Sequence, residues 1–217
     1  FATGYRQAAY QRAIDALRAA NPTNTSSPVI PSVIGASIRA KIAEFLATGR
    51  IGKLETQRSQ ARARAELGAI MGAGPACVGR WIDMGILSVA DLRRACAAGS
   101  VTLTRMQKLG VRYYDDLNQR IPRNEVEAIG AAICRAATSH PRATCTLAGS
   151  YRRGAATSGD VDCLVVGCST RELLSVLETD PKFVDTIMIG DEKASVLYKG
   201  TRVRQVDLLC VDAAGYF

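Results

Sequence analysis

Two aspartates one residue apart, Asp160 and Asp162, stand at the start of the apolar run Val161 to Val166. Alternate side chains of a strand share a face, so both carboxylates point to one side while the apolar residues between them pack on the other. Two carboxylates held close together repel each other, and a divalent cation relieves that repulsion. Hard oxygen ligands favour Mg²⁺ or Mn²⁺. The spacing therefore indicates a metal site, and a solvated strand end is the alternative.

The segment in front of the aspartates has the composition of a phosphate-binding loop. Thr144 to Ala148 is expected to be a strand, followed by Gly149-Ser150, the pair Arg152-Arg153 and the flexible run Thr157 to Gly159. Glycines allow close backbone approach, a serine hydroxyl donates to a phosphate oxygen, and either arginine can pair with a phosphate. A phosphate loop that leads into paired carboxylates is typical of nucleotidyl transfer, in which metal ions neutralise a triphosphate and activate the attacking hydroxyl.

A third carboxylate is expected on a neighbouring strand, and the candidate is Asp207 within Val203 to Val211. An acid in the middle of so apolar a strand is costly unless it is paired. The partner is either the same metal site or a local arginine, Arg202 or Arg204.

Length and composition predict a globular protein. The 217 residues, 47% of them apolar, can build two or three small cores. No apolar stretch reaches the length of a membrane-spanning helix, and no signal-peptide pattern is found at the N-terminus. Seven cysteines without regular spacing favour a reducing compartment over a disulfide framework. His140 is the only histidine, which excludes a Cys/His zinc site and a histidine-based triad.

Charge is distributed unevenly along the chain. Residues 1–123 contain 18 Lys and Arg against 8 Asp and Glu, a balance of +10, whereas residues 124–217 contain 10 against 12, a balance of −2. Such segregation indicates that the first half holds a polyanion and presents it to an acidic second half. A merely solvating surface is the alternative, and it would scatter the cations.

Helical patterns dominate the first half of the sequence. Residues 3–20 and 38–47 read as helices, the second ended by Thr48-Gly49, and further helices are expected at 89–98 and 104–117. The runs Val33 to Gly35 and Ile70 to Pro75 are each typical of a helix-hairpin-helix turn, which presents backbone N–H groups to a DNA phosphate. The first run is degenerate, and an ordinary packing corner is the alternative for the second. After them, helices are expected at 125–137 and 171–177.

Taken together, these motifs resemble the signature of the family X DNA polymerases, and of their β branch in particular. The signature residues are Gly149 to Gly154, Ser158 to Asp162, and Asp207. The resemblance extends through almost the whole chain, at Tyr5–Ala9, Ile42–Arg50, Gly72–Pro75 and Arg120–Arg123.

The resemblance implies a DNA repair polymerase that fills short gaps by two-metal nucleotidyl transfer, with deoxynucleoside triphosphates and gapped or nicked DNA as partners. Magnesium or manganese would be held by Asp160, Asp162 and Asp207. Residues expected at the incoming nucleotide are Arg120, Gly149, Ser150, Arg153, Ser158 and Gly159. Backbone carbonyls expected to hold a monovalent cation, Na⁺ or K⁺, are those of Gly68, Ile70 and Ala73. Residues expected at DNA are Tyr5, Gly35, Gly72, Gly74 and Arg204.

A second chemistry is implied for Lys41, whose cationic neighbours favour the free amine. In the family, the corresponding lysine forms a Schiff base with an abasic 5′ sugar and expels it by β-elimination, and Tyr5 matches a tyrosine of that pocket. The resemblance thus implies 5′-deoxyribose phosphate lyase activity in base excision repair; a plain phosphate contact is the alternative. Ser37 replaces a lysine of the pocket, and the family's 5′-phosphate-binding residues would lie at or before Phe1.

Two departures concern the catalytic half. Gln205 stands where the family usually has a basic residue beside the third aspartate. The family also continues beyond that aspartate into a subdomain that clamps the incoming base, whereas this sequence ends at Phe217. We therefore expect a fragment that folds and binds gapped DNA, yet inserts nucleotides at least about 100-fold more slowly than a longer chain.

These observations predict an α+β protein with two N-terminal all-α helix-hairpin-helix domains and an incomplete nucleotidyltransferase palm built on a small mixed β-sheet. The expected domains are 1–56, lyase-like; 57–120, helix-hairpin-helix; and 121–217, palm. We expect a monomer without membrane contact, located in the nucleus or mitochondrion. The alternatives are a DNA-binding or scaffold module with an idle palm, and another palm-type nucleotidyltransferase.

Overall fold

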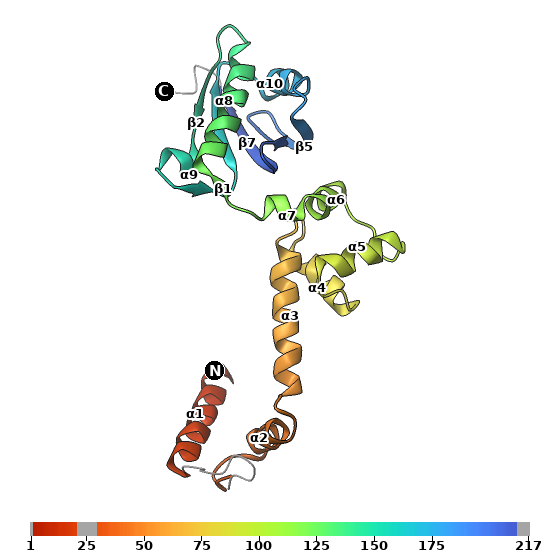
Figure 1. Ribbon diagram of the computed structural model, residues 1–217, viewed down its shortest axis with the longest axis vertical. Coiled ribbons are helices and arrows are strands. Elements are labelled where there is room, and N and C mark those ends of the chain that lie inside the picture. Colours follow the sequence, from red (N-terminus) through yellow and green to blue (C-terminus); the bar gives the residue numbers. More distant parts are fainter. Residues whose placement is uncertain (1, 21–29, 212–217) are drawn as a thin grey trace. The chain divides into compact units, whose positions relative to one another are not determined.

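The computed structural model describes residues 2–20 and 30–211, and it divides into two compact units, Phe1–Ala63 and Arg64–Phe217 (Figure 1). Helix α3, Gly52–Gly68, crosses the boundary between them. Among the described residues, no helix combines the length and apolar character that crossing a membrane requires.

The first unit contains α1, Ala2–Ala20, and α2, Ala36–Thr48, as well as most of α3. Helix α2 ends where its sequence predicts, because Gly49 adopts a left-handed conformation with φ of 69° and donates its N–H to the Phe45 carbonyl. Ile34 is buried in front of α2, and Gly35 is the extended residue that caps this helix.

The second unit begins with four short helices, α4 (Pro75–Asp83), α5 (Val89–Ala97), α6 (Arg105–Arg112) and α7 (Tyr114–Leu117). Ser88 caps α5, and Thr104 forms a capping box with Gln107 at the start of α6. The single helix expected at 104–117 is wrong, because the chain leaves helical geometry at Tyr113, which ends α6 and precedes α7.

The rest of the second unit is built on a five-stranded mixed sheet in the order β2-β4-β7-β6-β5. Strands β4 and β7 are parallel, and the other neighbours are antiparallel. The strands are β2 (Thr144–Leu147), β4 (Val161–Val166), β5 (Phe183–Ile189), β6 (Lys193–Lys199) and β7 (Val203–Val211). A separate two-stranded ladder pairs β1 (Ile121–Pro122) with β3 (Thr157–Ser158).

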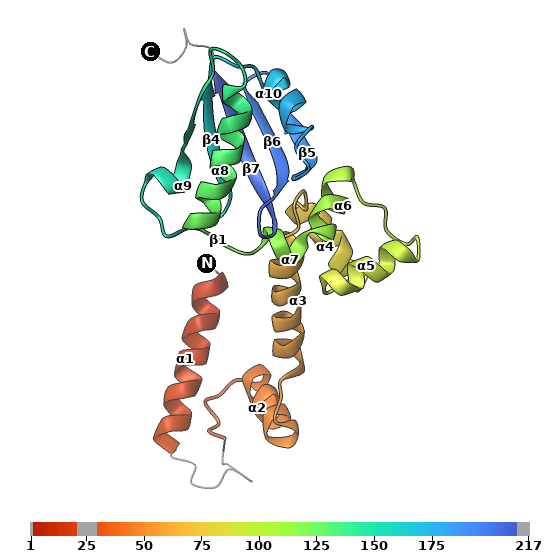
Figure 2. The ribbon, with the colours of Figure 1, turned by 45° about the horizontal axis from the view of Figure 1, so that its top comes forward.

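Helices α8 (Arg123–Thr138) and α10 (Thr170–Leu177) lie on one face of the sheet (Figure 2). The core forms between them and the strands, where the alternating pattern of β4 buries Val161, Cys163 and Val165. The aspartates therefore lie on the opposite face, as their spacing predicts. The expected α+β class, with helices first and a small mixed sheet after them, is confirmed.

Two of the seven cysteines, Cys134 of α8 and Cys145 of β2, are joined by a disulfide, whereas the sequence favoured a reducing compartment. The free thiols are Cys77, Cys96, Cys163, Cys168 and Cys210. Burial raises the pKa of the Cys163 thiol to about 12, so this side chain acts as an uncharged core residue.

Candidate metal and nucleotide site

The three predicted aspartates converge on the face of the sheet opposite α8 and α10. The parallel register of β4 and β7 places Asp162 directly opposite Asp207, and Asp160 immediately precedes β4. One carboxylate oxygen from each residue lies within 4.8 Å of the others. Three hard oxygen donors at this separation fit Mg²⁺ or Mn²⁺, so the donor set supports the metal that the sequence indicates.

Gly149 allows residues 149–159, the predicted phosphate-binding segment and called the phosphate loop below, to approach this cluster. It begins the short helix α9, Gly149–Arg152, with a positive φ of 53°, and the Ala148 N–H donates to the Asp162 carbonyl 2.9 Å away. A Cβ on Gly149 would overlap the Asp162 carboxylate. Both the backbone conformation and the close approach therefore require glycine at this position.

The carboxylates have unequal surroundings. Burial raises the pKa of Asp162 above its ordinary value, the charges of Asp160 and Asp207 raise it further, and Lys193 and Arg153 act in the opposite direction. Asp207 pairs neither with Arg202 nor with Arg204, the two arginines considered from the sequence. Its hydrogen-bond partners are Ser195 and Gln205, and its ion-pair partner is Lys193.

The rest of the expected nucleotide-binding set gathers around β3. The Ser150 hydroxyl donates to that of Ser158 at 2.7 Å, and Arg153 is exposed. Arg120 precedes β1 and reaches across the β1–β3 ladder to the Thr157 carbonyl at 2.6 Å. A Cβ on Gly159 would lie 3.5 Å from the Arg120 guanidinium. The structure thus brings Arg120, Ser158 and Gly159 together, and their role at a triphosphate stays a prediction.

Arg123 stabilises the phosphate loop, a role that the sequence did not indicate. Its guanidinium lies 3.9 Å from the centre of the Tyr151 ring and donates to the carbonyls of Tyr151 and Ala155 at 3.0 and 3.3 Å. Glu127, one turn along α8, accepts the Tyr151 hydroxyl at 3.0 Å. Because these contacts join α8 to a loop about 28 residues away in sequence, local patterns could not reveal them.

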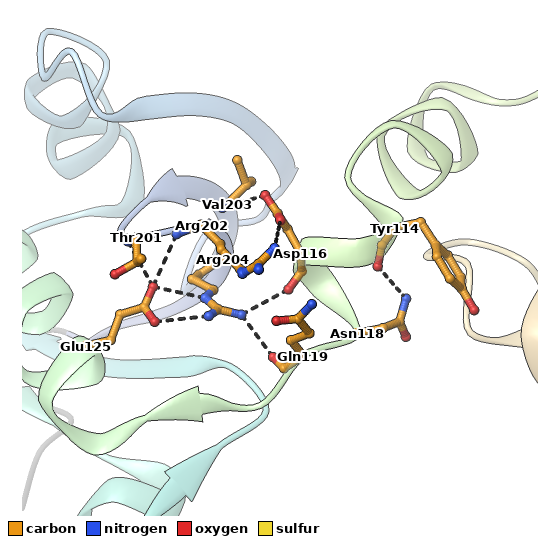
Figure 3. A network of polar contacts seen from close by, with 9 residues as sticks. All are labelled: Tyr114, Asp116, Asn118, Gln119, Glu125, Thr201, Arg202, Val203 and Arg204. Carbon is orange, nitrogen blue, oxygen red and sulfur yellow. Dashed lines mark hydrogen bonds and ion pairs between the residues drawn. The ribbon is translucent and has the colours of Figure 1, made fainter.

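Arg204, expected at DNA, instead lies inside the protein with 4% of its surface exposed. It forms a two-point ion pair with Glu125 of α8, with N–O distances of 3.1 and 3.0 Å, and also donates to the carbonyls of Asp116 and Gln119 (Figure 3). The DNA contact is wrong for this residue, because its position in β7 turns the side chain to the helix-covered face and its donors are satisfied there.

The same network connects the short helix α7 with the sheet. Asp116 accepts from the Val203 N–H at 3.0 Å and from Arg202 at 3.1 Å (Figure 3). The hydrogen bond from Val203, together with the nearby arginines, holds the pKa of Asp116 below its ordinary value. Since Gln119 directly precedes Arg120, this junction also fixes the backbone that carries an expected nucleotide contact.

The expected cation site lies in the turn between α3 and α4. Of the three carbonyls proposed there, that of Ile70 accepts from the Ala73 N–H at 2.9 Å, and Gly68 is the last residue of α3. Gly72 has a φ of 78°, and Gly74 is the extended residue that caps α4, with Pro75 at its first position. The cation and the DNA contacts at these glycines stay predictions.

Lys41 lies on α2, and its amine contacts the hydroxyl of Tyr10 on α1. The amine is also 4.9 Å from the centre of the Tyr10 ring. Tyr10 was not singled out from the sequence. The side chain of Tyr5, the residue expected in this pocket, lies outside the described part of the chain.

Two family models match the second unit. The model described as DNA polymerase beta palm matches residues 120–212, and that described as the fingers domain of DNA polymerase lambda matches residues 65–118. The residues of the site from Arg120 to Asp207 all fall within the first match.

Curated relatives point to the same family. A DNA polymerase lambda of Arabidopsis thaliana is 36% identical over 135 residues, which cover 61% of this chain and 25% of the relative. A DNA polymerase lambda of Rattus norvegicus is 31% identical over 164 residues, 74% of this chain and 28% of the relative. A DNA nucleotidylexotransferase of Eulemur macaco is 30% identical over 132 residues, which cover 60% of this chain and 24% of the relative. This chain therefore spans about a quarter of the length of these relatives. The expected family is confirmed, whereas a specific likeness to its β branch is not.

Proposed function

Since the chain carries the fingers and palm of a family X DNA polymerase, we propose that it adds deoxynucleotides at short gaps in DNA during repair. The observation that carries this proposal is the meeting of three carboxylates, Asp160, Asp162 and Asp207, with the loop that begins at Gly149. A cluster of carboxylates beside a glycine-bearing loop suits a substrate that brings both phosphates and metal ions.

In this proposal the three aspartates hold Mg²⁺ or Mn²⁺, which would offset the charge of the triphosphate and favour ionisation of the primer hydroxyl. Ser150, Arg153, Gly159 and Arg120 orient the phosphates through hydrogen bonds and charge. Arg123 keeps the loop in place by its contacts with Tyr151 and Ala155.

The test is single-turnover insertion of one deoxynucleotide into a one-nucleotide gap, measured for this chain and for a version extended at its C-terminus, with Asp162→Ala introduced into the extended version. We expect the substitution to slow insertion at least about 100-fold, because metal ligation contributes several kcal/mol to the chemical step. DNA affinity should change little, since this aspartate contributes no positive charge to DNA binding. DNA binding without insertion even by the extended version would favour a scaffold module, and a preference for RNA or small-molecule acceptors would favour another nucleotidyltransferase.

We also propose a 5′-deoxyribose phosphate lyase activity at Lys41, supported by the contact between its amine and the Tyr10 hydroxyl. A tyrosine hydroxyl beside an amine can exchange a proton with it while a Schiff base forms. Borohydride should trap a covalent product with an abasic 5′ end, and Lys41→Ala should remove that product. Trapping that survives the change would assign the chemistry to another amine.

The DNA partner is proposed to contact both helical hairpins, at Gly35, Gly72 and Gly74, with Na⁺ or K⁺ at the second hairpin. A polymerase with these partners works where DNA is stored, so we place the protein in the nucleus or mitochondrion and propose that it acts as a monomer.

A further inference from the structure

Three side chains surround Asp207, and they differ in charge. The Ser195 hydroxyl and the Gln205 amide donate to its Oδ1 at 2.7 and 2.9 Å. The Lys193 ammonium lies 3.4 Å from its Oδ2. The two neutral donors orient the carboxylate and leave its charge in place, whereas Lys193 is the partner that neutralises it.

The sheet register explains why these residues meet. Ser195 of β6 is paired with Asp207 of β7, and Lys193 lies two residues before Ser195 on the same face of β6. Gln205 lies two residues before Asp207 on β7 and therefore shares that face too. On the other side of β7, Asp162 is the register partner of Asp207. Lys193 thus belongs to the face that carries the carboxylates.

We propose that Lys193 is a positioning residue that holds Asp207 by charge and competes with a divalent cation for this carboxylate, so that it sets how tightly the site binds metal. The proposal rests on the metal site proposed above. It assigns a function to a residue that is neither a metal ligand nor an expected nucleotide contact.

The competition follows from electrostatics. A divalent ion bound by Asp207 would lie close to the ammonium, and two positive charges a few ångström apart repel each other even in a well-solvated site. Lys193 has 55% of its side chain exposed and Asp207 has 18%, so the amine can swing into solvent when an ion takes its place. The hydrogen bonds from Ser195 and Gln205 do not oppose the ion, because neutral donors leave other carboxylate lone pairs free.

The charge of Lys193 also reaches the other strand of the site. Asp162 is the register partner of Asp207, and carboxylate oxygens of Asp160, Asp162 and Asp207 lie within 4.8 Å of one another, so an ammonium beside Asp207 acts on all three charges. Removing Lys193 therefore leaves the carboxylates with less compensating charge, and a divalent cation gains attraction for the whole cluster.

The experiment measures Mn²⁺ binding to the protein by electron paramagnetic resonance, without nucleotide or DNA. Lys193→Met removes the charge and keeps a side chain of similar length, while Lys193→Arg keeps the charge and is the matched control. We expect Lys193→Met to lower the Kd for Mn²⁺ about two- to fivefold, the range that an exposed ion pair supports, and Lys193→Arg to leave it near the original value. The difference should shrink in about 1 M salt, where the screening length falls to about 3 Å.

The outcomes separate this inference from the proposed function. If Lys193→Met binds Mn²⁺ with unchanged or lower affinity while Asp207→Asn weakens binding, the metal site stands and the competition is refuted. If the unaltered protein binds no Mn²⁺, or if Asp207→Asn binds it equally well, the proposed metal site fails and the role of Lys193 fails with it. Circular dichroism of each variant checks that the fold is retained.

Discussion

At the scale of single residues, the site depends on one contact between a glycine and a carboxylate. Gly149 sits where any side chain would overlap Asp162, and its positive φ disfavours other residues as well. The phosphate loop can therefore lie against the aspartates only because this position lacks a Cβ. Gly154, in the same loop, shares the positive φ but has open space around it.

These two glycines form a matched pair for mutation. Gly154→Ala should lower the free energy of unfolding by about 1–2 kcal/mol, the cost of a left-handed conformation. Gly149→Ala should cost about 1–3 kcal/mol more, because the loop must also move away from Asp162. Only Gly149→Ala should weaken Mn²⁺ binding. Urea unfolding and metal titration measure both effects, and equal losses of stability would mean that the close approach to Asp162 does not matter.

The ionised side chain of Asp162 should lower the free energy of unfolding. Its pKa is raised in the folded protein, so its stabilising contribution is present below the unfolded pKa and is lost as pH rises through the folded value. At pH 7, without divalent ions, Asp162→Asn should therefore raise the melting temperature by about 1–2 °C, a modest gain because solvent screens the site. The gain should vanish below the unfolded pKa, at about pH 3. A variant that is less stable than the original at pH 7 would contradict this account.

At the scale of elements, α7, α8 and β7 are held together around Arg204. Burial alone would raise the pKa of Glu125, yet the hydrogen bonds and charge of Arg204 outweigh it and hold this pKa below its ordinary value. The Thr201 N–H also donates to Glu125 at 3.0 Å, and Arg204 reaches the Asp116 and Gln119 carbonyls. The Arg204 side chain thus holds the segment that leads to Arg120 against β7, the strand that carries Asp207.

Breaking this buried pair from one side should be costly. Arg204→Met should lower the free energy of unfolding by about 3–5 kcal/mol, because it leaves the Glu125 charge buried without a partner. Arg202→Met, which removes a partly exposed pair with Asp116, should cost only about 0.2–1 kcal/mol. The double variant Arg204→Met/Glu125→Leu should be more stable than the sum of its single changes by about 1–3 kcal/mol. Denaturant unfolding measures the original chain, the three single variants including Glu125→Leu, and the double variant. Similar losses for the two arginine variants would refute the central role of Arg204.

The sequence could predict the elements better than their partners. Alternation located β4 and β7 and placed Asp160, Asp162 and Asp207 on one face, since a strand's period is fixed by its backbone. The register that puts Lys193 beside Asp207, and α8 beside Arg204, depends on contacts between distant segments. Arg204 was therefore assigned to DNA, and Lys193 was not noticed, although both lie on the strands that build the site.

At the scale of the whole molecule, the uneven charge separates a basic part of the chain, suited to a polyanion, from the part that carries the carboxylate cluster. The +10 balance of residues 1–123 favours phosphate contacts with little sequence preference, whereas residues 124–217 carry the acidic site.

Affinity for gapped DNA should accordingly fall steeply with salt. If six or more phosphates are contacted, the Kd should rise by about 10³ between 50 and 200 mM salt. Fluorescence anisotropy measures the slope, and Arg171→Gln, a change on the exposed part of α10 in the other half, should leave it unchanged. An affinity indifferent to salt would contradict the electrostatic premise.

We propose that Asp160, Asp162 and Asp207 form one divalent-metal site beside a bound triphosphate. Crystals grown with Mn²⁺ and a deoxynucleoside triphosphate test this site through the anomalous scattering of manganese. We predict anomalous peaks about 2 Å from carboxylate oxygens, with all three aspartates among the ligands and the phosphates next to Gly149 and Ser150. A map without such a peak, or with a peak that Asp207 does not coordinate, would contradict the account.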